Sequence, residues 1–144
     1  MKVKECMCED ISYCTPSTKI SDVAKIMNQN KVGCIPVCDD KKCVVGILTD
    51  RDIILRCVAC DKDVCNTTVS DIMTCNTVCC DCNEDVNKVA ENMGKTGIRR
   101  MPVTENGKLV GILTIGDLAK HQNISSQCVG TTFEHICNCD QRSC

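Results

Sequence analysis

Two short segments carry side chains that could hold a phosphorylated ribose. Thr49 and Asp52 are separated by two residues, and Thr114 and Asp117 repeat that spacing in the second half of the chain. A Thr hydroxyl beside the free amides of a helix N-terminus can bond a phosphate, and a carboxylate one turn later can accept from ribose hydroxyls. The same Thr-x-x-Asp pattern is also a variant of the helix capping box, which needs no ligand. Both interpretations stay open at the level of the sequence.

Each pair requires a strand that ends at the Thr and a helix that begins directly after it. The runs 44–48 and 109–113 are apolar and short, which predicts buried strands. Helical periodicity follows over about 50–59 and about 115–121. The apolar residues that form the periodic pattern of the first of these helices are Ile53, Ile54, Cys57 and Val58.

The two halves of the chain are copies of one another. A series of residues recurs at one constant spacing, which shortens by a single residue at a turn and then stays constant again. Such regularity is the signature of a duplicated structural unit. The recurring residues are Val3, Met7, Ala24, Met27, Pro36 and Val37, which correspond to Val69, Met73, Ala90, Met93, Pro102 and Val103.

The repeated pattern predicts a β-α-β-β-α order in each half, an α/β (α+β) fold. The first helix is expected from Ile20 to about Asn30 with Thr18 as its cap, and its copy from about Asp85 with Gly94 to end it. Hairpins follow in both halves, and the second turn contains Asn106-Gly107. The hairpins' first strands are expected over 34–38 and 101–104, at a sheet edge or irregular at Pro36 and Pro102, which leaves backbone groups for a ligand.

Composition narrows the classes of protein. The net charge of -2 provides no positive field for nucleic acid. The sequence contains no apolar run of the roughly 20 residues that would span a bilayer, and its charged N-terminus lacks the pattern of an export signal. We therefore expect a cytoplasmic protein without nucleic-acid or membrane partners. Its 17 cysteines are interpreted mostly as reduced thiols, many of them packing residues, since Trp is absent and Tyr and Phe occur once each.

These features together resemble a tandem pair of cystathionine-β-synthase (CBS) domains, the Bateman module. The expected organisation is a first repeat over 1–60, a linker over 61–68, a second repeat over 69–121 and a Cys-rich tail over 122–144. The resemblance implies two pseudo-symmetric repeats packed as one module, with two clefts, and pairing into a homodimer. It also implies a regulatory protein that binds AMP, ADP, ATP or S-adenosylmethionine and signals to an unknown partner, with neither catalysis nor a catalytic cofactor.

The resemblance assigns roles to particular residues. It implies that the Thr and Asp of each junction contact the ligand, and that basic residues before the strand proline contact phosphate. Backbone groups of 12–15 and 78–80 would line the adenine. The candidate ligand-binding residues are Cys14, Thr15, Ile35, Pro36, Thr49, Arg51, Asp52, Val78, Cys80, Arg99, Arg100, Met101, Pro102, Thr114 and Asp117.

The two expected sites are unequal. Arg99 and Arg100 correspond to Gly33 and Cys34, and a guanidinium matches phosphate through two parallel hydrogen bonds. The alternative for the arginines is an ordinary solvated surface. Arg51 has Gly116 as its counterpart and could serve either site. The second site is therefore predicted to be the better phosphate site.

The cysteines support an alternative function, thiol-based metal binding or redox response. His135, Cys137, Cys139 and Cys144 could form a tetrahedral zinc site, although Cys-x-Cys spacing is weakly diagnostic. His121 and His135 are otherwise interpreted as surface residues. No nucleophile triad or long Gly-rich phosphate loop is present, so an enzyme is the class with least support.

Overall fold

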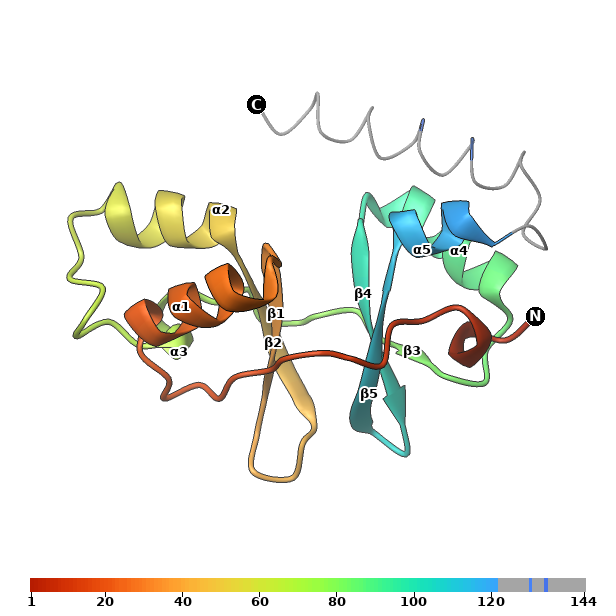
Figure 1. The fold of residues 1–144 in the computed structure, drawn as a ribbon, viewed down its shortest axis with the longest axis horizontal. Coiled ribbons are helices and arrows are strands. Elements are labelled where there is room, and N and C mark those ends of the chain that lie inside the picture. Colours follow the sequence, from red (N-terminus) through yellow and green to blue (C-terminus); the bar gives the residue numbers. More distant parts are fainter. Residues whose placement is uncertain (122–129, 131–133, 135–144) are drawn as a thin grey trace. The chain divides into compact units, whose positions relative to one another are not determined.

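The computed structural model describes residues 1–121 together with residues 130 and 134 (Figure 1). The chain divides into two compact units, which we name after their long helices, α1 (Ile20–Asn30) and α4 (Val86–Thr96). The α1 unit comprises Ser12–Thr77 and Gly107–Leu109. The α4 unit comprises Met1–Ile11, Val78–Asn106 and the described residues from Val110 on.

The α1 unit is built around an antiparallel hairpin. Cys34 pairs with Thr49 and Pro36 with Ile47, and a bulge follows Val37. The segment before α1 adds a single parallel bridge, Cys14 to Val37, instead of a complete strand. The elements are α1, β1 (Cys34–Cys38), β2 (Val44–Thr49), α2 (Asp50–Ile53), the π-helical turn η2 (Ile54–Val58) and α3 (Val69–Ile72).

The α4 unit contains a three-stranded sheet of order β3-β4-β5. Its β3 is parallel to β4, with Cys80 opposite Val103. The hairpin turn has positive φ at both Asn106 and Gly107, which matches the predicted Asn-Gly turn. The elements are η1 (Val3–Glu5), β3 (Cys80–Asp81), α4, β4 (Arg100–Glu105), β5 (Lys108–Thr114) and α5 (Ile115–Lys120). The predicted α+β class and the copied hairpins are confirmed.

The opening segment of each repeat packs with the other repeat. Cys8 exchanges two backbone hydrogen bonds with Ile112, of 2.9 and 3.0 Å, and Thr74 exchanges two with Ile47, of 2.9 and 3.0 Å. The red N-terminal segment accordingly runs beside β5 in Figure 1. The repeat boundaries therefore describe the sequence, whereas each compact unit contains a segment from the other repeat.

A glycine makes each of these crossings possible. A Cβ added at Gly111 would lie 2.7 Å from Met7 Sδ and 2.9 Å from the Cys8 carbonyl oxygen. At Gly46 it would lie 2.8 Å from Met73 Sδ and 2.9 Å from the Thr74 carbonyl oxygen. All four distances are shorter than van der Waals contact, so the strand accepts the crossing backbone only where it has no side chain.

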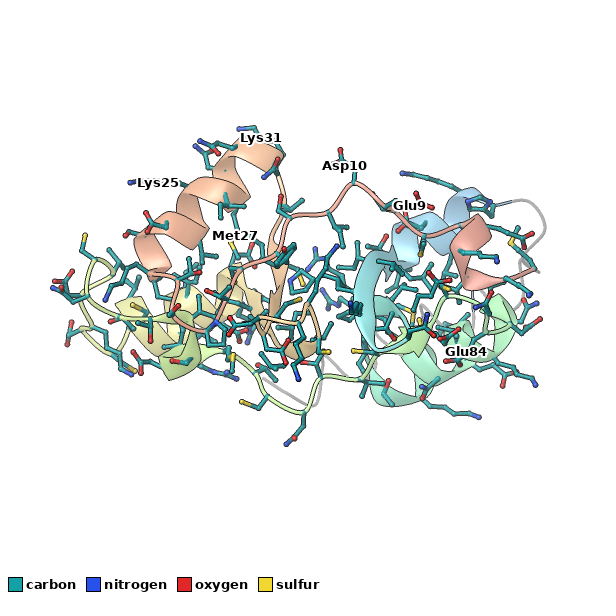
Figure 2. The ribbon with its side chains drawn as sticks, turned by 90° about the horizontal axis from the view of Figure 1, so that it is seen from below. Glu9, Asp10, Lys25, Met27, Lys31 and Glu84 are labelled. Atoms are coloured by element: carbon teal, nitrogen blue, oxygen red, sulfur yellow. The ribbon has the colours of Figure 1, made fainter. Side chains whose placement is uncertain are left out.

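Each unit has its own apolar core. In the α4 unit Val3 packs with α4 residues, and in the α1 unit Val69 packs with α1 residues. In α1, Met27 lies on the side facing the strands and Lys25 on the opposite side (Figure 2). Cysteines act as small hydrophobes in both cores, which confirms the sequence prediction. Those in the two cores are Cys6, Cys80 and Cys82, and Cys14 and Cys57.

The ends of the two long helices differ from prediction. Thr18 does not cap α1, because Lys19 occupies the N-cap position and the Thr18 hydroxyl accepts a bond from the Thr15 amide. Asp85 does cap α4, through the amides of two following residues. The prediction that Gly94 ends α4 is wrong, because Gly94 is buried within the helix and Gly97, with φ of 73°, ends it.

The environments of further residues differ between the repeats or from prediction. Ala24 is exposed on α1, whereas its counterpart Ala90 is buried. Ile54 and Val58 are exposed, because η2 widens the turn and leaves only Ile53 and Cys57 of that apolar set buried. The strand containing Pro102 is central in its sheet and not at an edge, because β3 pairs with β4 just after the proline.

Candidate functional site

Both Thr-Asp junctions form complete capping boxes. Thr49 Oγ1 accepts from the Asp52 amide at 3.1 Å, and Asp52 Oδ2 accepts from the Thr49 amide at 3.0 Å. In the α4 unit the matching distances for Thr114 and Asp117 are 3.1 and 2.9 Å, and the Thr114 hydroxyl also donates to Asp117 Oδ2 at 2.7 Å. The structural interpretation of the motif therefore holds in both units.

A third capping box shows that the motif alone does not identify a binding site. Thr68 and Asp71 begin α3 with the same motif, and Asp71 Oδ2 accepts from the amide and the hydroxyl of Thr68, both at 3.0 Å. Hydrogen bonds from the backbone and hydroxyl of Thr68 lower the pKa of the Asp71 carboxyl. Evidence for a ligand must come from the groups around the other two boxes.

The second carboxylate oxygen distinguishes the two junctions. Asp52 Oδ1 lies 3.7 Å from Arg56 Nη2, and Arg56 also donates to the Ile72 carbonyl and the Thr74 hydroxyl at 3.0 and 3.1 Å. The part of the chain that the structure describes offers no hydrogen bond to Asp117 Oδ1. That oxygen is therefore available to accept a bond from a ligand hydroxyl.

The residue directly before the first strand of each hairpin is hydrogen-bonded to the junction of that unit. The Asp50 amide donates to the Gly33 carbonyl at 2.9 Å, and the Ile115 amide donates to the Arg99 carbonyl at 3.2 Å. The backbone thus places Arg99, and Arg100 after it, beside the first residues of α5. Both arginines are exposed. The α4 unit thus has two arginines in the chain beside its junction, where the α1 unit has Gly33 and Cys34.

The predicted adenine-lining segments lie beside β1 and β4. Cys14 donates its amide to the Pro36 carbonyl at 3.1 Å, and its carbonyl accepts from Cys38 at 2.8 Å. Cys80 pairs with Val103, and its carbonyl accepts from the Thr104 hydroxyl at 3.3 Å. The backbone at Cys14 and Cys80 is therefore already bonded within the protein. Free backbone groups must come from neighbouring positions such as Val78, which is 39% exposed.

The remaining candidates separate by unit and by exposure. Thr15 lies in the α1 unit with Arg51, which is exposed. Ile35, Pro36, Met101 and Pro102 are buried, and the side chains of Ile35 and Met101 belong to the apolar cores. The α1 unit thus brings together Cys14, Thr15, Ile35, Pro36, Thr49, Arg51 and Asp52, and the α4 unit brings together Val78, Cys80, Arg99, Arg100, Met101, Pro102, Thr114 and Asp117.

The cysteines among these residues are protonated thiols at neutral pH. Burial, with a contribution from Cys38, raises the pKa of Cys14 to about 12. Burial, with contributions from nearby acidic groups and thiols, raises the pKa of Cys80 to about 12. Each thiol lies near the carbonyl of its strand proline, at 3.9 Å from Pro36 and 4.0 Å from Pro102. Thiols of this kind are poor nucleophiles and poor metal ligands.

Two residues near the junctions were not among the sequence candidates. Arg56 stands four residues after Asp52, and this helical spacing could have predicted the pair. Asp50 accepts the Arg51 amide on its own Oδ1 at 2.8 Å, directly after the strand. The sequence signal that could have identified Asp50 is that the second repeat has Ile115 at the same position.

Comparison with known proteins identifies the repeated unit. The sequence model of the CBS domain matches residues 3–58 and again residues 69–123. The chain belongs to the CBS domain family. This CBS pair is 37% identical over 142 residues to the uncharacterized protein YlbB of Bacillus subtilis, which covers 98% of this chain and 95% of that protein. The predicted tandem CBS pair is confirmed.

Solved structures share the fold of this CBS pair. CBSX2 in complex with AMP has a TM-score of 0.72 and 28% identity, covering 83% of this chain and 93% of that chain. The CBS domain pair of protein MJ0100 in complex with 5′-methylthioadenosine and S-adenosyl-L-methionine has a TM-score of 0.74 and 29% identity, covering 83% and 94%. Hypoxic response protein I with two coordinated zinc ions has a TM-score of 0.77 and 26% identity, covering 84% and 98%.

The metal alternative falls mainly outside the described part of the chain. His135, Cys137, Cys139 and Cys144 lie outside the described residues. Among the residues that are described, no group of three or more His, Cys, Asp or Glu side chains is placed to hold a metal ion. The described helices also include none with the length and apolar character that a membrane crossing requires.

Proposed function

We propose that this CBS pair is a regulatory module, not an enzyme, that binds an adenosine-containing ligand and reports its presence to a partner protein. The observation that carries the proposal is the junction of the α4 unit. There Asp117 Oδ1 receives no hydrogen bond from the described residues, while Arg99 and Arg100 lie beside the start of α5. An available carboxylate oxygen suits ribose hydroxyls, and a guanidinium suits phosphate.

The comparisons support this choice of ligand class. CBS pairs of similar fold have been solved with AMP, and with 5′-methylthioadenosine and S-adenosyl-L-methionine. These ligands share adenosine and differ at the 5′ position. The proposed residues divide between these two parts of the ligand. Asp117 would bind the ribose common to all three, and the arginines would bind a phosphate.

The proposed function also concerns the oligomeric state and the cellular location of the protein. We expect a homodimer in the cytoplasm whose ligand occupancy changes its affinity for the regulated protein. A ligand alters that affinity only to the extent that it binds the two conformations of the module unequally. No catalytic cofactor is required for such a role.

Calorimetric titration under reducing conditions tests the proposal. AMP, ADP, ATP and S-adenosylmethionine are titrated separately, and cytidine monophosphate serves as a control that has phosphate and ribose but no adenine. We expect saturable binding of at least one adenosine compound and much weaker binding of cytidine monophosphate. Absence of heat with every adenosine compound at millimolar concentration would refute the proposal.

The metal-binding alternative has its own test. A similar structure contains two coordinated zinc ions, and this chain has 17 cysteines. If the segment with His135, Cys137, Cys139 and Cys144 holds zinc, freshly purified protein contains the metal and a chain truncated after residue 127 loses it. Elemental analysis of the two proteins separates this function from nucleotide binding.

A further inference from the structure

The two junctions differ in charge at two equivalent positions. In the α1 unit the first helical residue is Asp50, and Gly33 lies beside it directly before β1. In the α4 unit the corresponding residues are Ile115 and Arg99. A carboxylate and a missing side chain therefore stand where the other unit has an apolar side chain and a guanidinium.

The Asp50 carboxylate occupies the junction of the α1 unit. Its Oδ1 accepts the Arg51 amide at 2.8 Å, so it neutralises a helix N-terminal donor that an anion would otherwise use. Its Oδ2 lies 2.9 Å from the position that a Cβ on Gly33 would take. The carboxylate thus fills the space in which a side chain equivalent to Arg99 would begin.

Among the described residues, neither neighbouring arginine forms an ion pair with Asp50. Arg56 forms its ion pair with Asp52 and donates to the segment at Ile72 and Thr74. Arg51 makes no ion pair with Asp50 among the described residues, although it is the next residue in the chain. A phosphate brought to this junction would meet an anion, and the repulsion between like charges grows where water is excluded.

We infer that the α1 unit selects adenosine derivatives whose 5′ substituent carries no phosphate, whereas the α4 unit takes the phosphorylated ones. This inference rests on the proposed function and specifies its ligand class at the first junction. Thr49 and Asp52 form the same capping box as their counterparts, and Asp52 Oδ1, which lies 3.7 Å from Arg56 Nη2, would accept from the ribose in competition with that ion pair. Asp50 excludes a phosphate and tolerates an uncharged thioether or a cationic sulfonium.

The test isolates the α1 unit by disabling the other junction. Arg100→Ala and Asp117→Ala are combined in a background protein, whose folding is checked by circular dichroism. AMP and 5′-methylthioadenosine are then titrated by calorimetry into the background protein and into the same protein with Asp50→Asn. Asp40→Asn, an exposed change of equal charge in the turn between β1 and β2, serves as the matched control.

We expect the background protein to bind 5′-methylthioadenosine at least about tenfold more tightly than AMP, which corresponds to about 1.4 kcal/mol. Asp50→Asn should remove most of that difference by strengthening AMP binding, and Asp40→Asn should leave it unchanged. Equal affinities in the background protein, or no binding of 5′-methylthioadenosine there while wild type binds AMP, overturn the inference alone. Failure of the wild-type chain to bind any adenosine compound instead removes the proposed function itself.

Discussion

At the scale of single residues, the proposed function depends on one carboxylate oxygen. Asp117 uses Oδ2 for the capping box, and Oδ1 receives no hydrogen bond from the described residues. Asp71 has the same capping role at α3 with no arginine pair beside it. Variants at Asp117 and Asp71 can therefore distinguish the loss of a helix cap from the loss of a ligand contact.

Replacement of Asp117 by Ala should weaken nucleotide binding by the α4 unit about 10- to 150-fold. A hydrogen bond to a charged acceptor is worth roughly 1.5 to 3 kcal/mol, which gives that range. Asp71→Ala removes an equivalent cap and should leave the affinity unchanged. Calorimetry measures both, and an unaltered affinity in Asp117→Ala would show that this Asp only caps its helix.

Sequence reasoning identified both Thr-Asp junctions because the motif is local and repeated. It did not reveal that the Asp50 carboxylate lies against Gly33, since that approach depends on how the chain before β1 packs on α2. The pairing of Asp52 with Arg56 was accessible from spacing alone. The sequence thus showed the arginines that the first junction lacks, but not the place of Asp50 beside Gly33. The inequality of the two sites as phosphate sites stays a prediction.

At the scale of elements, the strands β2 and β5 depend on a close crossing at a glycine. Gly111 accommodates Met7 and the Cys8 carbonyl, whereas a Cβ at Gly116 in α5 would meet only Thr114 Oγ1, at 3.5 Å. The two glycines therefore form a matched pair for the same substitution, one in a crowded position and one in an open position.

Gly111→Ala should destabilise the protein by about 1 to 3 kcal/mol, the usual range for overpacking, because Met7 and the crossing backbone must move. Gly116→Ala lies in a helix, where Ala is favoured over Gly, and should leave the stability unchanged or raise it by up to about 1 kcal/mol. Urea unfolding without ligand measures both changes. Equal midpoints for Gly111→Ala and wild type would contradict the role assigned to the crossing.

The sequence pattern predicted the existence of these elements better than their ends. Periodicity located α1 and α4, yet Thr18 and Gly94 were assigned capping roles that belong to neighbouring positions. Residues suited to a cap occur at several places near each end, and the choice among them depends on tertiary contacts. The Thr18 hydroxyl, for example, accepts from Thr15 instead.

At the scale of the whole molecule, both units rely on buried neutral thiols. Burial raises the pKa of Cys14 and of Cys80 from the ordinary value of 9.0 to about 12. The folded protein therefore keeps protons that the unfolded chain loses above pH 9. The stabilisation is complete below that pH and is lost as the pH rises from about 9 to about 12.

The free energy of unfolding should accordingly fall across that alkaline window. In Cys80→Ala the slope should be smaller, because one of the thiols whose pKa is raised no longer contributes. Cys75 is exposed, and Cys75→Ala serves as the control. Urea unfolding at a series of pH values in reducing buffer gives the slopes, and an identical slope for Cys80→Ala and wild type would contradict this account.

Ligand binding should also raise the stability of the molecule. A nucleotide at about 100 times its dissociation constant adds roughly 2.7 kcal/mol when it binds only the folded state. A thermal scan with and without AMP measures the shift, and the shift should be much reduced in Asp117→Ala. A full shift in that variant would place the nucleotide elsewhere.

The exchange of segments between repeats could not be read from the sequence. The duplication predicts two similar sets of elements, but it does not state which strand each opening segment joins. The structure places Cys8 with Ile112 and Thr74 with Ile47. Each half of the duplication therefore completes its core with a segment of the other.

The most direct measurement is a crystal structure of the chain grown with millimolar AMP. The account predicts electron density for the nucleotide at the α5 junction, with its ribose hydroxyls donating to Asp117 Oδ1 and its phosphate beside Arg99 or Arg100. AMP bound away from Asp117 and both arginines, or a junction that stays empty at saturating AMP, would contradict the central claim.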